Sequence, residues 1–183
     1  MEGGFDLVIV GAGPGGLATA VTARAAGLSV LLLNEQQHLG GQIYHSLDAV
    51  RVENRQILGE DYLHGQQLID DFKKSGTTYI SGASVLEVTG EDTVCYLKTG
   101  ETVLVKCKQV VLSTGAIERP VPLPGWTLPG VMGAASVDVL LKQANILPTC
   151  KVSLAGSGPL LLTVVCHLLD CGVKIDNILD TSS

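Results

Sequence analysis

The fold of this chain is decided by residues 5–35, which read FDLVIVGAGPGGLATAVTARAAGLSVLLLNE. A short apolar run ends at Gly11, an alanine-rich segment with apolar residues at helical spacing follows, and a second apolar run occupies residues 28–33. Gly27 stands where a helix commonly ends in a left-handed residue. The pattern predicts a strand, a helix and a parallel second strand, and therefore an α/β fold with a Rossmann-like sheet.

The glycine loop, residues 11–16 with the sequence GAGPGG, has a spacing that suits a bound dinucleotide. Gly11 permits the tight turn, Gly13 lets the backbone approach a pyrophosphate, and Gly16 permits close packing of helix on strand. The helix N-terminus offers free N–H groups and the positive end of its dipole to an anion. Glu35, at the tip of the second strand, can accept hydrogen bonds from both ribose hydroxyls. These residues alone leave open whether the dinucleotide is FAD or NAD.

Apolar and turn patterns predict the elements that follow. A helix is expected at about residues 65–74 and a third parallel strand at residues 77–80. An antiparallel β-meander is indicated by three alternating runs, residues 84–88, 93–98 and 102–107. Residues 109–113 return as an apolar strand, and a proline-broken connector carries one short helix at about residues 136–143.

A weaker copy of the opening pattern begins at Cys150 and reads CKVSLAGSGPLLLTVVCHLLDCGVKIDNILD. Its Gly156 and Gly158 match the first two glycines of the glycine loop, and Asp180 could hold an unphosphorylated ribose, which favours NAD over NADP. Leu161, however, replaces the small residue that lets helix and strand pack closely, so this second loop is the weaker candidate for NAD. An isolated strand–helix–strand cannot bury both faces of its strands. We therefore expect a partner chain or further residues to cover it.

Charge and composition exclude several kinds of function. The chain has 12 basic and 18 acidic residues, a net charge of -6, and no basic run that could follow a nucleic acid backbone. Its longest apolar stretches are far shorter than the roughly 20 residues that span a bilayer. The acidic N-terminus does not resemble a secretory signal. We expect a soluble cytoplasmic protein, with its five cysteines buried in a reducing compartment and no metal site.

Three segments resemble the two-dinucleotide-domain flavoprotein superfamily, which includes glutathione and thioredoxin reductases. They are the glycine loop with Glu35, the segment Gly40–Gly41–Gln42, and residues 110–125, VVLSTGAIERPVPLPG. In that superfamily the first fold holds FAD and an inserted second fold holds NAD(P)H. The resemblance implies FAD binding by Gly11, Gly13, Pro14, Gly15, Gly16, Glu35, Gln36, Gly40, Gly41, Gln42, Val85, Thr114, Gly115 and Ala116.

Within this set, the resemblance implies different roles for different segments. Residues 40–42 match the loop that runs along the pyrophosphate and ribityl chain. Residues 113–115 match the place where the chain passes near the cofactor as it returns to the sheet. Val85 matches the position where a backbone group often meets the adenine.

A narrower resemblance rests on GGQIYHS at residues 40–46, on residues 113–142, and on VSLAGSGPLLL at residues 152–162. These segments are similar to the larger or α subunits of opine oxidases, hydrogen cyanide synthase and dye-linked proline or hydroxyproline dehydrogenases. The similarity covers nearly all of this chain but only the N-terminal part of such a protein. It implies the FAD-binding portion of an amine or amino-acid dehydrogenase subunit, which transfers electrons beside a second flavin-containing subunit that takes the substrate.

The resemblance divides the chain into an FAD-binding domain at residues 1–125, a connector at residues 126–149, and a truncated NAD(P)-binding-like part at residues 150–183. The superfamily's third FAD segment, which follows the second domain, is not in this sequence, so we expect no activity from the chain alone. Disulfide reduction is not expected, because residues 42–45 stand where glutathione reductases carry a cysteine pair. No catalytic residue is predicted, although the resemblance implies that His45 is the histidine nearest the cofactor.

The sequence is also compatible with two other functions. In the first, the chain is a non-catalytic fragment or split subunit that folds and binds its cofactor only with a partner or with a missing C-terminal region. In the other, it is a plain NAD-dependent dehydrogenase, which would bind NADH rather than FAD at the glycine loop.

Overall fold

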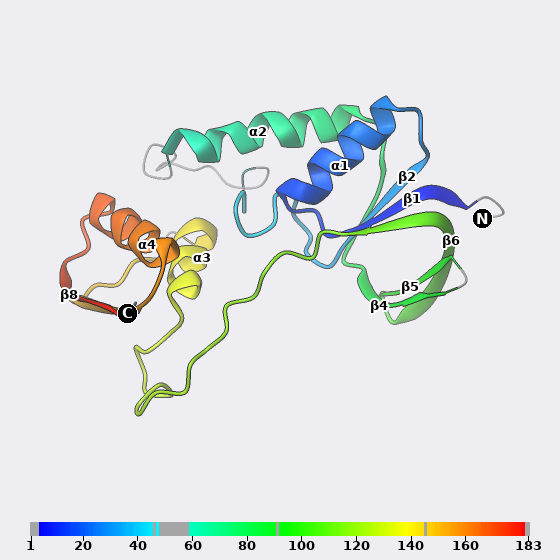
Figure 1. Cartoon of the computed structure of the whole chain (residues 1–183). Helices are drawn as coiled ribbons and strands as arrows, with labels where there is room; N and C mark the ends of the chain where they lie inside the picture. Colours follow the sequence, from blue (N-terminus) through cyan, green and yellow to red (C-terminus); the bar gives the residue numbers. More distant parts are fainter. Residues whose placement is uncertain (1–3, 46, 48–58, 91, 145, 182–183) are drawn as a thin grey trace. The chain divides into compact units, whose positions relative to one another are not determined.

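The computed structural model describes residues 4–45, 47, 59–90, 92–144 and 146–181. They form two compact units that divide between Gly115 and Ala116 (Figure 1). The first unit holds the glycine loop, and the second holds its weaker copy. The α/β class expected from the sequence is confirmed in both.

The first unit is built on one six-stranded sheet with the strand order β3-β2-β1-β6-β5-β4. Its parallel part joins β3, β2, β1 and the C-terminal half of β6, and its antiparallel part joins the N-terminal half of β6 to β5 and β4. The strands are β1 (Phe5–Val10), β2 (Val30–Asn34), β3 (Thr78–Ser81), β4 (Ser84–Thr89), β5 (Thr93–Lys98) and β6 (Glu101–Leu112). Helix α1 (Pro14–Ala25) connects β1 to β2, and α2 (Gly59–Lys74) precedes β3.

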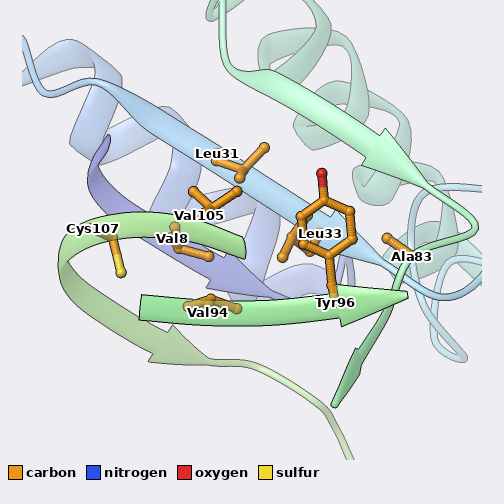
Figure 2. Close-up of a cluster of buried hydrophobic side chains, with 8 residues drawn as sticks. All are labelled: Val8, Leu31, Leu33, Ala83, Val94, Tyr96, Val105 and Cys107. Atoms are coloured by element: carbon orange, nitrogen blue, oxygen red, sulfur yellow. The ribbon is translucent and has the colours of Figure 1, made fainter. Parts of the chain in front are cut away.

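The core of the first unit lies on both faces of the parallel strands. On one face, Val8, Leu31 and Leu33 pack against side chains of the meander, as Figure 2 shows. That cluster is completed by Ala83, Val94, Tyr96, Val105 and Cys107. Side chains alternate along a strand, so the neighbouring Leu32 points to the opposite face. Burial on both faces explains why β2 reads as a continuous apolar run.

The predicted elements are present, with two differences. The sequence predicts two separate strands at residues 102–107 and 109–113. This prediction is wrong, because β6 runs unbroken from Glu101 to Leu112. Only Lys108 separates the two runs, and a single lysine does not end a strand. Helix α2 begins at Gly59 rather than near residue 65. The sequence GEDYLH at residues 59–64 has no apolar periodicity of its own, so it does not predict this earlier start.

The second unit contains a short helix and a strand–helix–strand. Helix α3 (Ala134–Ala144) precedes β7 (Val152–Gly156), α4 (Pro159–Asp170) and β8 (Ile175–Asp180), and the two strands pair in parallel. Its small core consists of Leu154, Leu161, Val164, Val165, Leu168 and Val173. In the part of the chain that the structure describes, no helix has both the length and the apolar character needed to cross a membrane.

Asp6 ties the start of β1 to the turn before β2. Its carboxylate pairs with the Lys108 ammonium at 2.7 Å and accepts hydrogen bonds from the Ser29 hydroxyl at 2.6 Å and the Ser29 N–H at 2.8 Å. Hydrogen bonding from Lys108, and then from Ser29, lowers the pKa of Asp6 well below its usual range. A carboxyl with a lowered folded pKa stabilises the fold fully above its unfolded pKa of about 3.9, and this stability is lost as the pH falls toward the folded pKa.

We predict that Asp6→Asn lowers the free energy of unfolding at neutral pH, and that its deficit relative to the wild type shrinks between about pH 5 and about pH 2. Urea unfolding at a series of pH values measures this. Glu87→Gln, at an exposed position of β4, is the control and should keep the wild-type pH dependence. A deficit of Asp6→Asn that stays constant with pH would contradict the role given to the carboxylate.

Candidate cofactor site

The glycine loop lies at the carboxyl ends of β1 and β6, where the winding of the parallel sheet changes direction. From β1 the chain proceeds to β2 and β3 on one side, while β6 lies on the other side. The Gly11 N–H donates to the Leu33 carbonyl at 2.8 Å, and the Ser113 N–H donates to the Val10 carbonyl at 2.8 Å. Ligands of open α/β sheets bind at such a switch point, outside the carboxyl ends of the strands.

Two glycines of the loop are required by the fold itself. Gly11 has a φ of +102°, and a Cβ at this position would collide with the Ser113 carbonyl oxygen. A Cβ at Gly16 would collide with the Gly11 carbonyl oxygen. Helix α1 therefore approaches the end of β1 more closely than any side chain at position 16 would allow.

Gly13 has no such reason to be glycine. Its φ of -74° and ψ of -179° are open to any residue, and the nearest atom to a Cβ would be the Gly41 Cα at 4.0 Å. A Cβ at Gly15 would likewise meet only the Ser113 Oγ, at 3.9 Å. The missing side chains leave open space in front of the α1 N-terminus. A glycine that the fold itself does not require is typical of a site where a ligand approaches the backbone closely.

The N-terminus of α1 also offers unused donors. Among the residues that the structure describes, no side chain caps the helix, and its first residue, Pro14, carries no N–H. Leu17 donates to the Gly13 carbonyl at 3.0 Å. Within the described residues, the N–H groups of Gly15 and Gly16 have no acceptor. Free N–H groups at the positive end of a helix are suited to bind a phosphate.

The predicted segment at Gly40 and Gly41 packs against the glycine loop. The Gly40 N–H donates to the Ala12 carbonyl at 2.9 Å. A Cβ at Gly41, whose φ is +61°, would lie 2.8 Å from the Gly13 Cα. The structure thus brings residues 40 and 41 to the open space in front of α1. Gln42, the next predicted residue, is exposed.

Glu35 follows the last residue of β2 and is exposed. The Ser84 hydroxyl donates to its carboxylate at 3.3 Å, and Ser84 opens β4. This contact places Glu35 beside the neighbouring Val85, whose side chain packs partly buried against the meander core. A role of Val85 toward a cofactor would therefore fall to its backbone. Gln36 is exposed, and its carbonyl is held by the Asn34 side chain at 2.9 Å.

The remaining predicted residues directly follow β6. Thr114 and Gly115 are exposed and come immediately after Ser113, whose carbonyl faces Gly11. Gly115 has a φ of +76°. Ala116 is also exposed but belongs to the second unit. The structure therefore brings Thr114 and Gly115 to the same sheet edge as the glycine loop.

Sequence reasoning missed Asn34, the last residue of β2. Its side-chain oxygen accepts from the Ala12 N–H at 3.1 Å, and its amide nitrogen donates to the carbonyls of Gln36 at 2.9 Å and His38 at 3.1 Å. The available signal was a polar residue that ends an otherwise apolar strand. The His38 ring also makes an edge contact with His45, with ring centroids 6.4 Å apart. This contact gives His45 no chemical role.

The second loop, residues 156–161, differs in shape from the glycine loop. Gly158 has a φ of +86°, which differs from the negative φ of Gly13. Leu161 is buried in the core of the second unit, and its Cδ1 lies 3.8 Å from where a Cβ of Gly156 would be. The Gly156 carbonyl accepts from the N–H and hydroxyl of Thr181 at 2.8 and 3.0 Å. A leucine at position 161 therefore prevents the close helix approach seen in the first unit.

Comparison with known proteins agrees with this class of fold. Residues 5–178 match the pyridine nucleotide-disulphide oxidoreductase family, and the chain belongs to that family. It is 41% identical to an opine oxidase subunit of Agrobacterium tumefaciens, over 97% of this chain and 37% of that protein. It is 35% identical to hydrogen cyanide synthase subunit HcnB of Pseudomonas protegens, over 92% of this chain and 36% of that protein.

A solved structure shows the same fold. The L-proline dehydrogenase of P. horikoshii matches with a TM-score of 0.75 and 23% identity, over 96% of this chain and 35% of that chain. The resemblance drawn from the sequence motifs is thereby confirmed. The chain spans little more than a third of the length of these relatives.

We predict that Gly13→Ala and Gly16→Ala differ sharply in stability. The Gly16 variant should lose about 2 kcal/mol or more, because its methyl group meets the Gly11 carbonyl. The Gly13 variant should lose less than about 1 kcal/mol, because its methyl group meets no atom closer than the Gly41 Cα at 4.0 Å. Urea unfolding followed by circular dichroism measures both.

The matched control is Gly90→Ala, at an exposed glycine with no atom within 4 Å of a Cβ and no positive φ. Its free energy of unfolding should stay within about 0.5 kcal/mol of the wild type. A Gly13 variant as unstable as the Gly16 variant would show that the fold itself requires both glycines.

Proposed function

We propose that the first unit binds FAD and that the chain is the FAD-binding portion of an oxidoreductase subunit, which transfers electrons in the oxidation of an amine, an opine or an amino acid. One observation carries this proposal. The N-terminus of α1 faces an open space at the switch point of the sheet, and Gly13 keeps that space free although the fold does not need a glycine there. Family membership and the names of the relatives support the redox class and the substrate class.

We propose that residues of the first unit bind the dinucleotide along its length. The N–H groups of Gly15 and Gly16 would bind the pyrophosphate beside Pro14, and Glu35, supported by Ser84, would bind the ribose hydroxyls. The rest of the proposed set would line the cofactor: Gly11, Gly13, Gln36, Gly40, Gly41, Gln42, Val85, Thr114, Gly115 and Ala116. Bound FAD would supply the two-electron chemistry, while the chain binds and orients it.

We propose a second flavin-containing subunit, or a further C-terminal region, as the partner that recognises the substrate. The relatives are named as subunits, and the chain spans little more than a third of their length. The proposed domains are residues 1–125 for FAD, residues 126–149 as connector and residues 150–183 as a partial NAD(P)-binding-like part. NAD binding at the second loop stays a weaker prediction, because Leu161 alters that loop.

The second candidate function is a non-catalytic portion that folds and binds its cofactor only with a partner. The second unit favours it, because large apolar side chains of α4 and β8 are exposed. They are Leu160, Leu162, Leu169, Ile178 and Leu179. Exposed apolar residues of this number on a small unit are suited to contact further protein.

We predict that the purified chain, incubated with FAD and freed of excess cofactor, shows the visible absorbance of a bound oxidised flavin. The expected ratio is one FAD per chain, because one glycine loop has the open geometry. A folded chain that takes up no flavin alone but does so with its partner would favour the second candidate function. Preferential binding of NADH would contradict FAD as the cofactor and favour a plain NAD-dependent dehydrogenase.

We predict that Glu35→Ala weakens FAD binding by on the order of 1–3 kcal/mol, because the ribose hydroxyls lose a charged acceptor. Ser84→Ala should have a smaller effect in the same direction, because its hydroxyl only supports that carboxylate. Glu87→Ala, at an exposed position of β4, is the matched control. Fluorescence titration with FAD measures all three affinities, and equal affinity of the Glu35 and Glu87 variants would refute the role of Glu35.

A further inference from the structure

We infer that Asn34 is a positioning residue of the cofactor site, which holds the glycine loop and the residues after β2 in their binding geometry before any cofactor is present. The link to FAD rests on the proposed function, while the effect on the loop rests on the hydrogen bonds of the chain itself.

The Asn34 side chain makes three hydrogen bonds to two separate stretches of backbone, one at Ala12 and the other at Gln36 and His38. Its oxygen accepts from the Ala12 N–H at 3.1 Å, and its nitrogen donates to the Gln36 and His38 carbonyls at 2.9 and 3.1 Å. In the part of the chain that the structure describes, it is the only buried side chain that carries an amide or a charge, with 9% of its surface exposed. A buried amide without these partners would strongly destabilise the fold. The three hydrogen bonds therefore hold the backbone at Ala12, Gln36 and His38 in one arrangement.

These contacts decide which donors face the open space. Ala12 gives its N–H to Asn34, its carbonyl accepts from the Gly40 N–H at 2.9 Å, and its side chain is buried. Ala12 therefore contributes no donor to an anion. The N–H groups without an acceptor in the described residues of the loop are those of Gly13, Gly15 and Gly16.

Asn34 also fixes the backbone on both sides of Glu35. Its own carbonyl accepts from the Ala83 N–H at 2.9 Å, and its side chain holds the Gln36 carbonyl at 2.9 Å. These hydrogen bonds restrain the backbone on both sides of Glu35, and its carboxylate thus lies beside Ser84. One buried amide connects the pyrophosphate end of the proposed site to its ribose end.

A matched control can separate this positioning role of Asn34 from a merely stabilising one. The control is a residue beside the opposite end of β2. Ser29 precedes β2 and exchanges hydrogen bonds with Asp6 across the sheet, at 2.6 to 2.8 Å. No hydrogen bond of Ser29 among the described residues reaches the glycine loop. Ser29→Ala therefore removes side-chain hydrogen bonds beside the same strand without touching the site.

The first experiment uses the full chain without added cofactor, and compares the wild type with Asn34→Leu, Asn34→Asp and Ser29→Ala by amide hydrogen exchange. The measured quantity is the exchange rate of the Ala12 amide divided by that of the Leu31 amide in the core. We expect this ratio to rise roughly tenfold or more in Asn34→Leu. It should stay near the wild-type ratio in Ser29→Ala. Asn34→Asp keeps the acceptor for Ala12 but loses both amide donors, so it should keep Ala12 protected. An unchanged Ala12 ratio in Asn34→Leu overturns the inference.

The second experiment titrates the same proteins with FAD. We expect Asn34→Asp to bind FAD roughly tenfold more weakly than the wild type, because its carboxylate repels the Gln36 and His38 carbonyls and adds charge near the pyrophosphate. Ser29→Ala should keep wild-type affinity even where its loss of stability is as large. Equal weakening in the two variants would show that Asn34 acts only through stability. If the wild type itself takes up no FAD, the proposed function fails, while the exchange ratios still decide the role of Asn34.

Discussion

The first unit depends on the contact between the N-terminus of α1 and the end of β1. Gly16 lies so close to the Gly11 carbonyl that no side chain fits between them. This approach points the first N–H groups of the helix toward one place at the switch point of the sheet. Gly13 keeps that place open, while Gly41 and the Asn34 amide hold the surrounding backbone. The geometry of the proposed phosphate site thus follows from glycine packing together with the Asn34 hydrogen bonds.

The second unit has a similar glycine pattern but lacks the close contact between helix and strand. Its strands and helix repeat the order of the first unit, but Leu161, at the position that corresponds to Gly16, packs in the core of the second unit where the first unit has no side chain. The second loop then takes another backbone conformation at Gly158. Two similar glycine patterns in one chain thus lead to unequal sites, and one side chain between helix and strand accounts for the difference. This supports assigning the cofactor to the first copy.

Local patterns predicted the parts of the structure that depend on neighbouring residues. The strand–helix–strand of residues 5–35 and the glycine roles at positions 11 and 16 follow from spacing and were expected. Asn34 was missed, because its partners are distant along the chain or lie in an irregular segment whose path no periodicity reveals. The contact between Glu35 and Ser84 is likewise non-local. The unbroken course of β6 depends on pairing with two different strands, which local composition does not show.

If Gly13 serves the cofactor and not the fold, a larger side chain there should block FAD without unfolding the chain. FAD titration of Gly13→Val, compared with Gly90→Val at an open turn glycine, tests this expectation most directly. We expect both variants to give the circular dichroism spectrum of the wild type, and only the Gly13 variant to lose flavin binding. A folded Gly13→Val protein that binds FAD as tightly as the wild type would show that no cofactor occupies this space.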